Sequence, residues 1–223
     1  MNARSIRNGC PSEADARHIA RQLSRSAETW SRTFGQTAGP DHVPLCAELQ
    51  REIQAYALCL LDFSLGGFDD DARRNFVSAV RRECGLHLPP GGWLGTGNSG
   101  FEGRYAAITR SGGGRSPQSE KVFQEFCQAT GLGVDTLVGR GANLASLVFY
   151  IVLHARISAT VPLRREAIQR LLKTAKECRA YYQVSLAEWL ATTHAPPQLQ
   201  SPHPSPATLA PASTIRALPP SAA

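Results

Sequence analysis

Residues 144–155 read LASLVFYIVLHA, the most apolar stretch of the chain. Leu144, Leu147, Val148, Ile151 and Val152 recur at steps of three and four residues, which is the spacing of one face of an α-helix. The residues between them are also largely apolar, and a helix that is apolar nearly all round is surrounded by other helices. A buried strand is the alternative for β-branched and aromatic residues, but no partner strand is evident. The stretch therefore predicts a core built of helices.

Helical patterns with recognisable start and end residues lie on both sides of this stretch. Ser12 and Asp15 form a capping pattern for a first helix that would end before Gly35. The sequence Ser116–Pro117 combines an N-cap with proline at the first helical position. The expected helices cover 12–34, 43–65, 69–84, 117–130, a core helix through 144–155, then 162–182 and 185–193. The sequence thus predicts an all-α, single helical domain of six or seven helices over residues 12–194.

Three segments differ in composition from this domain. Residues 86–117 hold nine of the 19 Gly, which predicts an irregular Gly-rich insertion, with a short hairpin arm as the structure expected for 101–110. Residues 195–223 hold eight of the 15 Pro and a single charge, which predicts a disordered Pro-rich C-terminal tail. Residues 1–11 are expected to be a flexible N-terminus.

Residues 95–100 read GTGNSG and match the dinucleotide-binding pattern G-x-G-x-x-G letter for letter. That site needs a strand before the glycines and a helix after them, because the helix N-terminus binds the pyrophosphate. The preceding LHLPPGG at 86–92 is not a strand pattern, and we expect no helix to open after Gly100. The interpretation is therefore a flexible loop, and the sequence predicts no cofactor.

The remaining reactive residues suggest no reaction. Six Cys without a C-x-x-C pair or a His at ligand spacing predict no metal site. Glu48 and Glu52 are expected on a solvated helix face, and no combination of residues forms a catalytic set. The sequence therefore favours a function other than catalysis. An enzyme with a site in the loop 91–103 is the third hypothesis for function.

Positive charge is concentrated at two ends of the predicted domain, since residues 1–34 and 161–194 each carry +3 of the net +6. Both segments are predicted helices with rows of cations opposite an apolar stripe, and arginine can fork two hydrogen bonds to a phosphate. The candidate polyanion-binding residues are Arg17, Arg21, Arg25, Arg165, Arg170, Lys173, Lys176 and Arg179. Binding of nucleic acid or another polyanion through helices 12–34 and 162–182 is therefore the second hypothesis for function.

The first hypothesis is a helical interaction protein, an adaptor, regulator or delivered effector that acts through contacts with a protein partner. It rests on the absence of a catalytic set and on the Pro-rich tail. No apolar run reaches the roughly 18 residues of a transmembrane helix, and the sequence begins without an apolar signal region. We expect a cytoplasmic location, with export through a non-classical signal as the alternative, and the sequence leaves the oligomeric state open.

Overall fold

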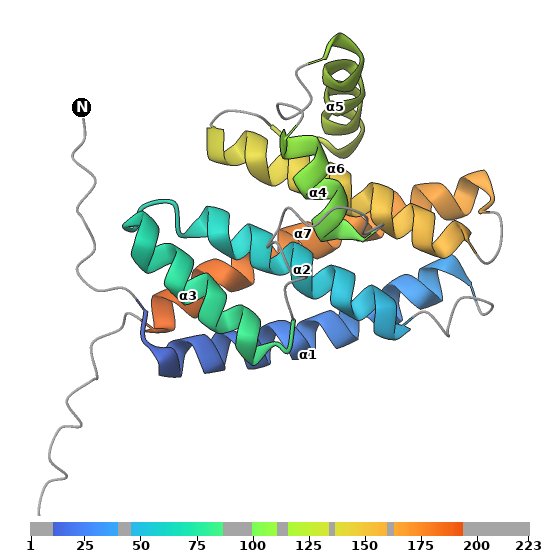
Figure 1. Ribbon diagram of the computed structural model, residues 1–223. Coiled ribbons are helices and arrows are strands. Elements are labelled where there is room, and N and C mark those ends of the chain that lie inside the picture. Colours follow the sequence, from blue (N-terminus) through green and yellow to red (C-terminus); the bar gives the residue numbers. More distant parts are fainter. Residues whose placement is uncertain are drawn as a thin grey trace, which may run out of the picture.

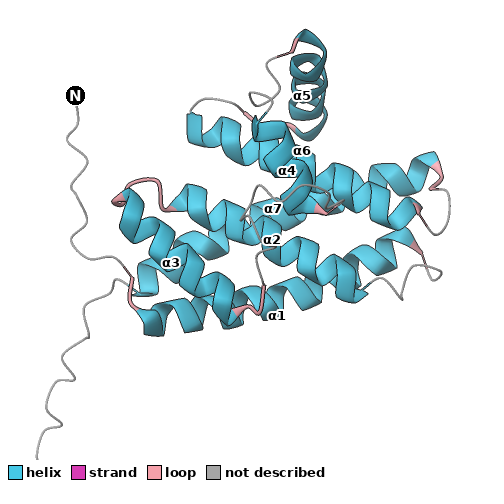
Figure 2. Ribbon diagram, in the orientation of Figure 1, coloured by secondary structure: helices cyan, strands magenta, loops and turns pink. Residues whose placement is uncertain are grey.

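The computed structural model describes residues 11–39, 46–86, 100–110, 116–133, 137–159 and 163–193. Seven α-helices and no strand are found within these ranges (Figure 2). They are α1 (Glu13–Ala38), α2 (Cys46–Ser64), α3 (Asp70–Glu83), α4 (Phe101–Arg110), α5 (Pro117–Thr130), α6 (Leu137–Ser158) and α7 (Arg165–Thr193). The predicted all-α fold is confirmed. The strand alternative for 144–155 is wrong, and the tail 195–223 and all but the last residue of segment 1–11 lie outside the described residues.

The helices form a bundle from which one helix projects. Figure 1 shows α1, α2, α3 and α7 side by side, with α1 packed against α2, α3 and α7. Helix α6 packs along α2 and α7, and α4 crosses both α2 and α6. Helix α5 makes its main contacts with α6 and α7 and extends away from the other helices (Figure 1).

Aromatic side chains join the helices at the centre of the bundle. The ring of Tyr56 in α2 stacks on Phe149 in α6, with centroids 4.3 Å apart and planes nearly parallel. Phe34 of α1 and Phe101 of α4 meet the Phe149 ring edge-on, at 6.0 and 6.4 Å. All four side chains are buried. The apolar stretch 144–155 therefore supplies the centre of the core, as its sequence predicts.

The capping residues expected from the sequence are found at the ends of α1 and α5. The Ser12 hydroxyl accepts the Asp15 N–H and the Asp15 carboxylate accepts the Ser12 N–H, which completes the capping box of α1. The Ser116 hydroxyl caps α5, and Gly131 ends that helix in the left-handed conformation at φ 65°. These caps bond only to groups within the same turn, so they are readable from sequence.

Two expected helix boundaries and one expected type of element are wrong. Helix α1 continues through Gly35 to Ala38, because Gly35 is buried against the bundle instead of ending the helix. Helix α7 is unbroken at Ser185, since this buried residue lies inside a continuous apolar stripe that runs from Tyr182 to Leu190. Residues 101–110 form the helix α4 and not a hairpin arm.

Among the described helices, only α6 is long and apolar enough to cross a membrane by length and composition, over Gly139–Ser158. Of that window, 56% is buried inside the bundle. A helix enclosed by α2, α4, α5 and α7 has the pattern of a core helix.

Candidate functional site

The Gly-rich motif does precede a helix, contrary to expectation, because α4 begins at Phe101 directly after Gly100. The N-terminus of α4 is already occupied: the Phe101 N–H donates to Oε2 of Glu52 at 2.6 Å. A carboxylate is favourable at this position because the helix dipole presents positive charge there. The chain's own side chain thus fills the place that a phosphate takes in a dinucleotide site. Residues 91–99 of the loop lie outside the described residues.

The sequence context of Glu52 predicts a solvated helix face, and this prediction is wrong. The Glu52 side chain is buried, with 8% of the residue exposed. Its Oε1 pairs with Arg156 of α6 at 3.1 Å, and Arg156 also reaches Glu48 at 3.5 Å. A Cβ atom built on Gly100 would lie 2.8 Å from Oε1 of Glu52. The last glycine of the motif therefore admits this carboxylate, and no short-range pattern in the sequence could have shown it.

A second buried pair holds α4 against α3. Arg81 donates to Glu102 at 2.6 Å, and both side chains are nearly enclosed. Burial lowers the pKa of the Arg81 guanidinium and raises the pKa of Glu102, an effect that Arg81 partly opposes. Glu52 and Arg81 thus attach α4 directly to α2 and α3, and Glu52 also binds Arg156 of α6. The residues around the Gly-rich motif therefore have a structural role.

The three predicted cations of α1 share one surface. Arg17, Arg21 and Arg25 are exposed and line a shallow hollow of about 460 Å³ together with Glu83 of α3. Helix α1 faces α7 through other residues, since the hydroxyl of Ser26 lies 3.1 Å from that of Tyr182. The arginine row therefore points away from α7.

Four predicted cations of α7 are exposed but lie elsewhere. Arg170 and Lys173 line a hollow with Thr37 at the C-terminal end of α1, and the Lys176 ammonium lies beside Gly131 at the C-terminal end of α5. Neither α1 nor α5 has a basic residue in its last turn, so these cations complement the negative ends of the two dipoles. Exposed Arg165 begins α7.

The two basic segments do not form one surface. Helices α1 and α7 run antiparallel, with Ser26 against Tyr182 and Thr37 against Thr174. The middle of the arginine row at Arg21 is 16 residues from Thr37, which is about 24 Å of helix. The sequence leaves open whether helices 12–34 and 162–182 share one basic face, and the structure places their exposed cations on two separate surfaces.

The prediction that Arg179 binds a polyanion is wrong, because this residue is only 4% exposed. Its guanidinium donates to the Ala142 carbonyl at 3.2 Å and to the Ser146 hydroxyl at 2.8 Å. Burial lowers its pKa, and no carboxylate of the described chain pairs with it. The helical period predicts Arg179 among the exposed cations, but α6 covers that side of α7.

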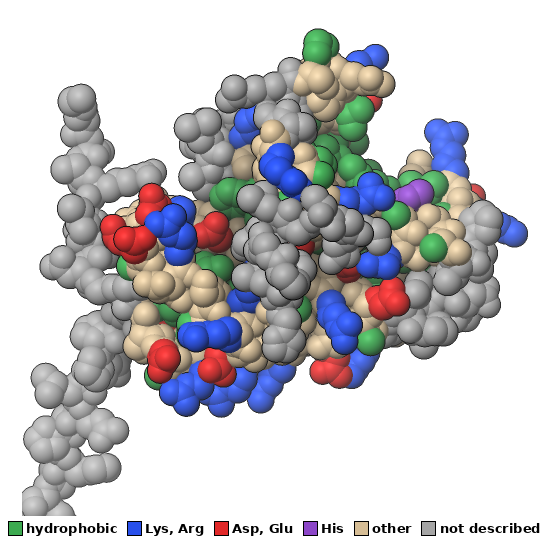
Figure 3. Space-filling view, in the orientation of Figure 1, with side chains coloured by type: hydrophobic (Ala, Val, Ile, Leu, Met, Phe, Trp, Pro, Cys, Tyr) green, Lys and Arg blue, Asp and Glu red, His purple; other side chains and the backbone are tan. Residues whose placement is uncertain are grey.

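An open apolar groove lies between α4, α5 and α6, and no pattern in the sequence predicts it. The groove has a volume of about 290 Å³. Figure 3 shows hydrophobic side chains at the surface where α5 meets the bundle. Val122 is 47% exposed at the groove, whereas Leu144 and Leu147 are buried in its floor. The apolar residues that line it are Ile108, Val122, Phe123, Leu144, Leu147 and Ile151.

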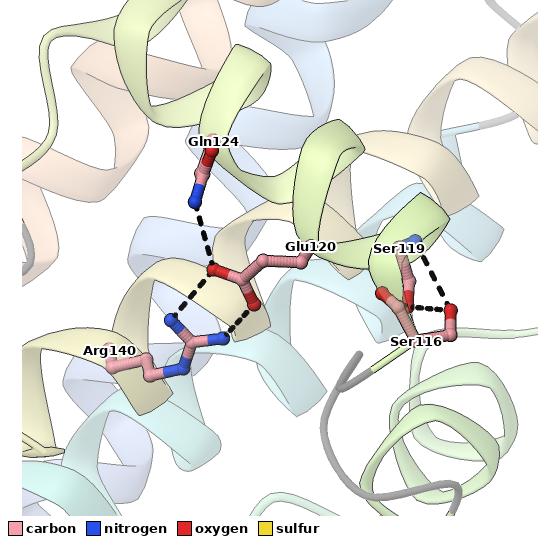
Figure 4. Close-up of polar contacts among 5 residues, drawn as sticks. All are labelled: Ser116, Ser119, Glu120, Gln124 and Arg140. Carbon is pink, nitrogen blue, oxygen red and sulfur yellow. Dashed lines mark hydrogen bonds and ion pairs between the residues drawn. The ribbon is translucent and has the colours of Figure 1, made fainter.

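A forked ion pair holds α5 on α6 beside this groove (Figure 4). The Arg140 guanidinium donates to both carboxylate oxygens of Glu120, at 3.3 and 2.5 Å, and lies over the Phe123 ring at 4.7 Å. These hydrogen bonds from Arg140 lower the pKa of Glu120. Beneath the pair, Phe123 and Cys127 form a small apolar cluster with the floor of the groove.

Cys59, Cys84, Cys127 and Cys178 are free thiols, packed among the helices as apolar groups. Burial raises the pKa of Cys59 to about 12 and that of Cys84 to about 11, so neither provides a thiolate nucleophile at neutral pH. Within the described ranges, no group of three His, Cys, Asp or Glu side chains could hold a metal ion.

Gly100→Ala is expected to lower the free energy of unfolding by about 1–3 kcal/mol, because the new Cβ would overlap a carboxylate held in place by two partners. Gly67→Ala is the control, since no atom lies within 4 Å of its Cβ position, and should change this free energy by less than about 0.5 kcal/mol. Urea unfolding followed by circular dichroism measures both. Equal changes in the two variants would contradict the role assigned to Gly100.

Arg179→Met is expected to leave the free energy of unfolding unchanged or to raise it by about 1–4 kcal/mol, because it removes a buried charge without an acidic partner. The Ser146 hydroxyl keeps its bonds to Ala142 and Tyr56. Arg81→Met is the matched control: it leaves Glu102 buried and unpaired and should cost about 3–5 kcal/mol. Thermal and urea unfolding distinguish the two, and a comparable loss in both variants would refute the contrast.

Glu120→Gln is expected to accelerate hydrogen exchange of the α5 amides at neutral pH. The folded pKa of Glu120 is lowered, so its charge stabilises the folded state above the unfolded value of about 4.3, and this contribution is lost as pH falls through the folded value. The difference between variant and wild type should therefore close in acid. Glu125→Gln, which affects an exposed pair within α5, is the control. A difference that persists at low pH would argue against the ion pair.

No protein-family model, no curated protein and no solved structure matches the chain. Two surfaces of the described residues are candidates on their physical properties: the apolar groove between α4, α5 and α6, and the arginine row of α1. The first is apolar and open beside a weakly attached helix, and the second is charged and solvent-exposed.

Proposed function

We propose that the chain is a helical interaction protein, an adaptor or regulator, that binds an amphipathic helix of a protein partner in the groove between α4, α5 and α6. The observation that carries this proposal is the open apolar groove itself, with Val122 47% exposed at its edge. Binding sites are typically concave and lined mostly by apolar side chains, and in this groove Ile108 and Ile151 are partly exposed beside Val122.

The length of the groove along α6 suits two turns of a helix. Leu144, Leu147 and Ile151 line it, and the first and last of them are seven positions apart, a rise of about 10 Å. Helices that bind in grooves use apolar anchors at i, i+3 or i+4, and i+7, which cover the same length. The proposed occupant is therefore a helix with at least two turns of apolar residues on one face.

The charges beside the groove indicate the polar face of that helix. Arg104 lies one turn before Ile108 on α4, and both Arg104 and Arg110 are exposed. Lys121 is exposed next to Val122 on α5. These cations favour acidic residues on either side of the apolar anchors, because complementary charge accelerates association and fixes orientation.

Other features fit an interaction protein better than an enzyme. Within the described part of the chain, the buried ionisable groups at the Gly-rich motif bond to one another, and Cys59, Cys84, Cys127 and Cys178 are packed as apolar groups. Free buried thiols also support the proposed cytoplasmic location, where cysteines stay reduced. The third hypothesis, an enzyme at the loop 91–103, gains no support from the residues described there.

Val122→Glu tests the proposal. A carboxylate in an apolar groove loses water without gaining a partner, and losing the burial of Val122 costs about 1.5 kcal/mol, so partner affinity should fall at least about tenfold. Val184→Glu is the matched control, because Val184 is 58% exposed on α7 and does not line the groove. It should leave affinity unchanged within about a factor of two.

The measurement is quantitative affinity purification with the three full-length baits, followed by titration of the recovered partner and of its helical segments. Loss of the same partner with Val122→Glu alone supports the groove. Equal retention by all three baits, or equal loss with both variants, would show that the groove is not the binding site.

A further inference from the structure

A second interaction surface lies on α1, independent of the groove. Arg17, Arg21 and Arg25 follow one another at four-residue spacing on the exposed side of the helix. Figure 3 shows Lys and Arg side chains gathered along the edge of the molecule formed by α1. The three arginines share a hollow with Ser24 and with one carboxylate, that of Glu83.

No carboxylate of the described chain forms an ion pair with these three arginines, although Glu83 lies in the same hollow. Arg32 on the same helix pairs with Glu28, and Arg74 on α3 pairs with Asp71 at 2.5 Å. In the row itself the one side-chain bond is from Arg21 Nε to the Arg17 carbonyl. Like charges at four-residue spacing repel by a few tenths of a kcal/mol per pair, so the row gains from an external anion.

The neighbouring residues indicate which anion fits. Large exposed apolar side chains in the described chain are Val122, Tyr181 and Val184, none of them on α1, so the row lacks the apolar residues that insert into a membrane surface. An aromatic platform for unpaired bases is also lacking, since Trp30 packs on Phe34 and Tyr181. What remains is charge recognition of a phosphate backbone.

The row is long enough to lie along several phosphates of a duplex. Successive arginines rise by about 6 Å along the helix, so the row covers about 12 Å. Duplex DNA carries one charge per roughly 1.7 Å of its axis, so several phosphates lie within this length. Each guanidinium can fork two hydrogen bonds to phosphate oxygens.

We propose that Arg17, Arg21 and Arg25 bind the phosphate backbone of duplex DNA without reading its sequence. Binding through three phosphates releases counterions in proportion, so the logarithm of the association constant should fall with the logarithm of salt concentration with a slope of about −2.7. This corresponds to about a 40-fold loss of affinity between 50 and 200 mM salt.

The experiment is fluorescence anisotropy of a labelled 20-base-pair duplex with the full-length protein across this salt range. Replacing Arg17, Arg21 and Arg25 by Gln should reduce affinity at 50 mM salt at least about tenfold and bring the salt slope close to zero. Replacing Arg165, Arg170 and Lys173 by Gln removes the same charge from the other surface and should leave the slope unchanged. Circular dichroism confirms that both triple variants are folded, as expected for exposed positions.

Three results would overturn the proposal. Absence of binding by the wild type at 50 mM salt would exclude duplex DNA. Equal weakening by the two triple variants would show that net charge, and not the α1 row, determines binding. Competition by a polyglutamate peptide as effective as unlabelled duplex at equal charge would assign the row to an acidic protein surface instead.

Discussion

The buried carboxylate of Glu52 determines how α2, α4 and α6 are arranged. It belongs to α2, pairs with Arg156 of α6 and accepts the first free N–H of α4. A buried charge is costly unless it is paired and hydrogen-bonded, so these three helices are held in one relative position. The position of α4 in turn places Ile108 beside α5 and α6. The groove on which the proposed function rests therefore depends on a carboxylate that makes no contact with it.

Features set by residues within one turn were readable from the sequence. The capping box of Ser12 and Asp15, and the start of α5 at Ser116, each need only a side chain and a backbone N–H three residues away. The apolar face from Leu144 to Val152 was equally legible, because its spacing has the helical period. Fold class and most helices follow from such local patterns.

Features set by distant partners were not readable. Glu52 and Arg179 both lie in sequences that resemble exposed helix faces, and each is buried by helices far away in the chain. Ser185 has the pattern of a helix start, yet the apolar stripe from Tyr182 to Leu190 keeps it inside α7. In each case burial against another element outweighs a local preference of about 1 kcal/mol or less.

The small cluster under α5 has a consequence for local stability. Phe123 and Cys127 pack on Leu144 and Leu147, apart from the main core around Tyr56 and Phe149. Helix α5 can therefore open as its own cooperative unit, at a free-energy cost below that of global unfolding. A ligand seated between α5 and α6 binds only the closed form and lowers the open population by mass action. The proposed partner would thus also determine how long α5 stays attached to the bundle.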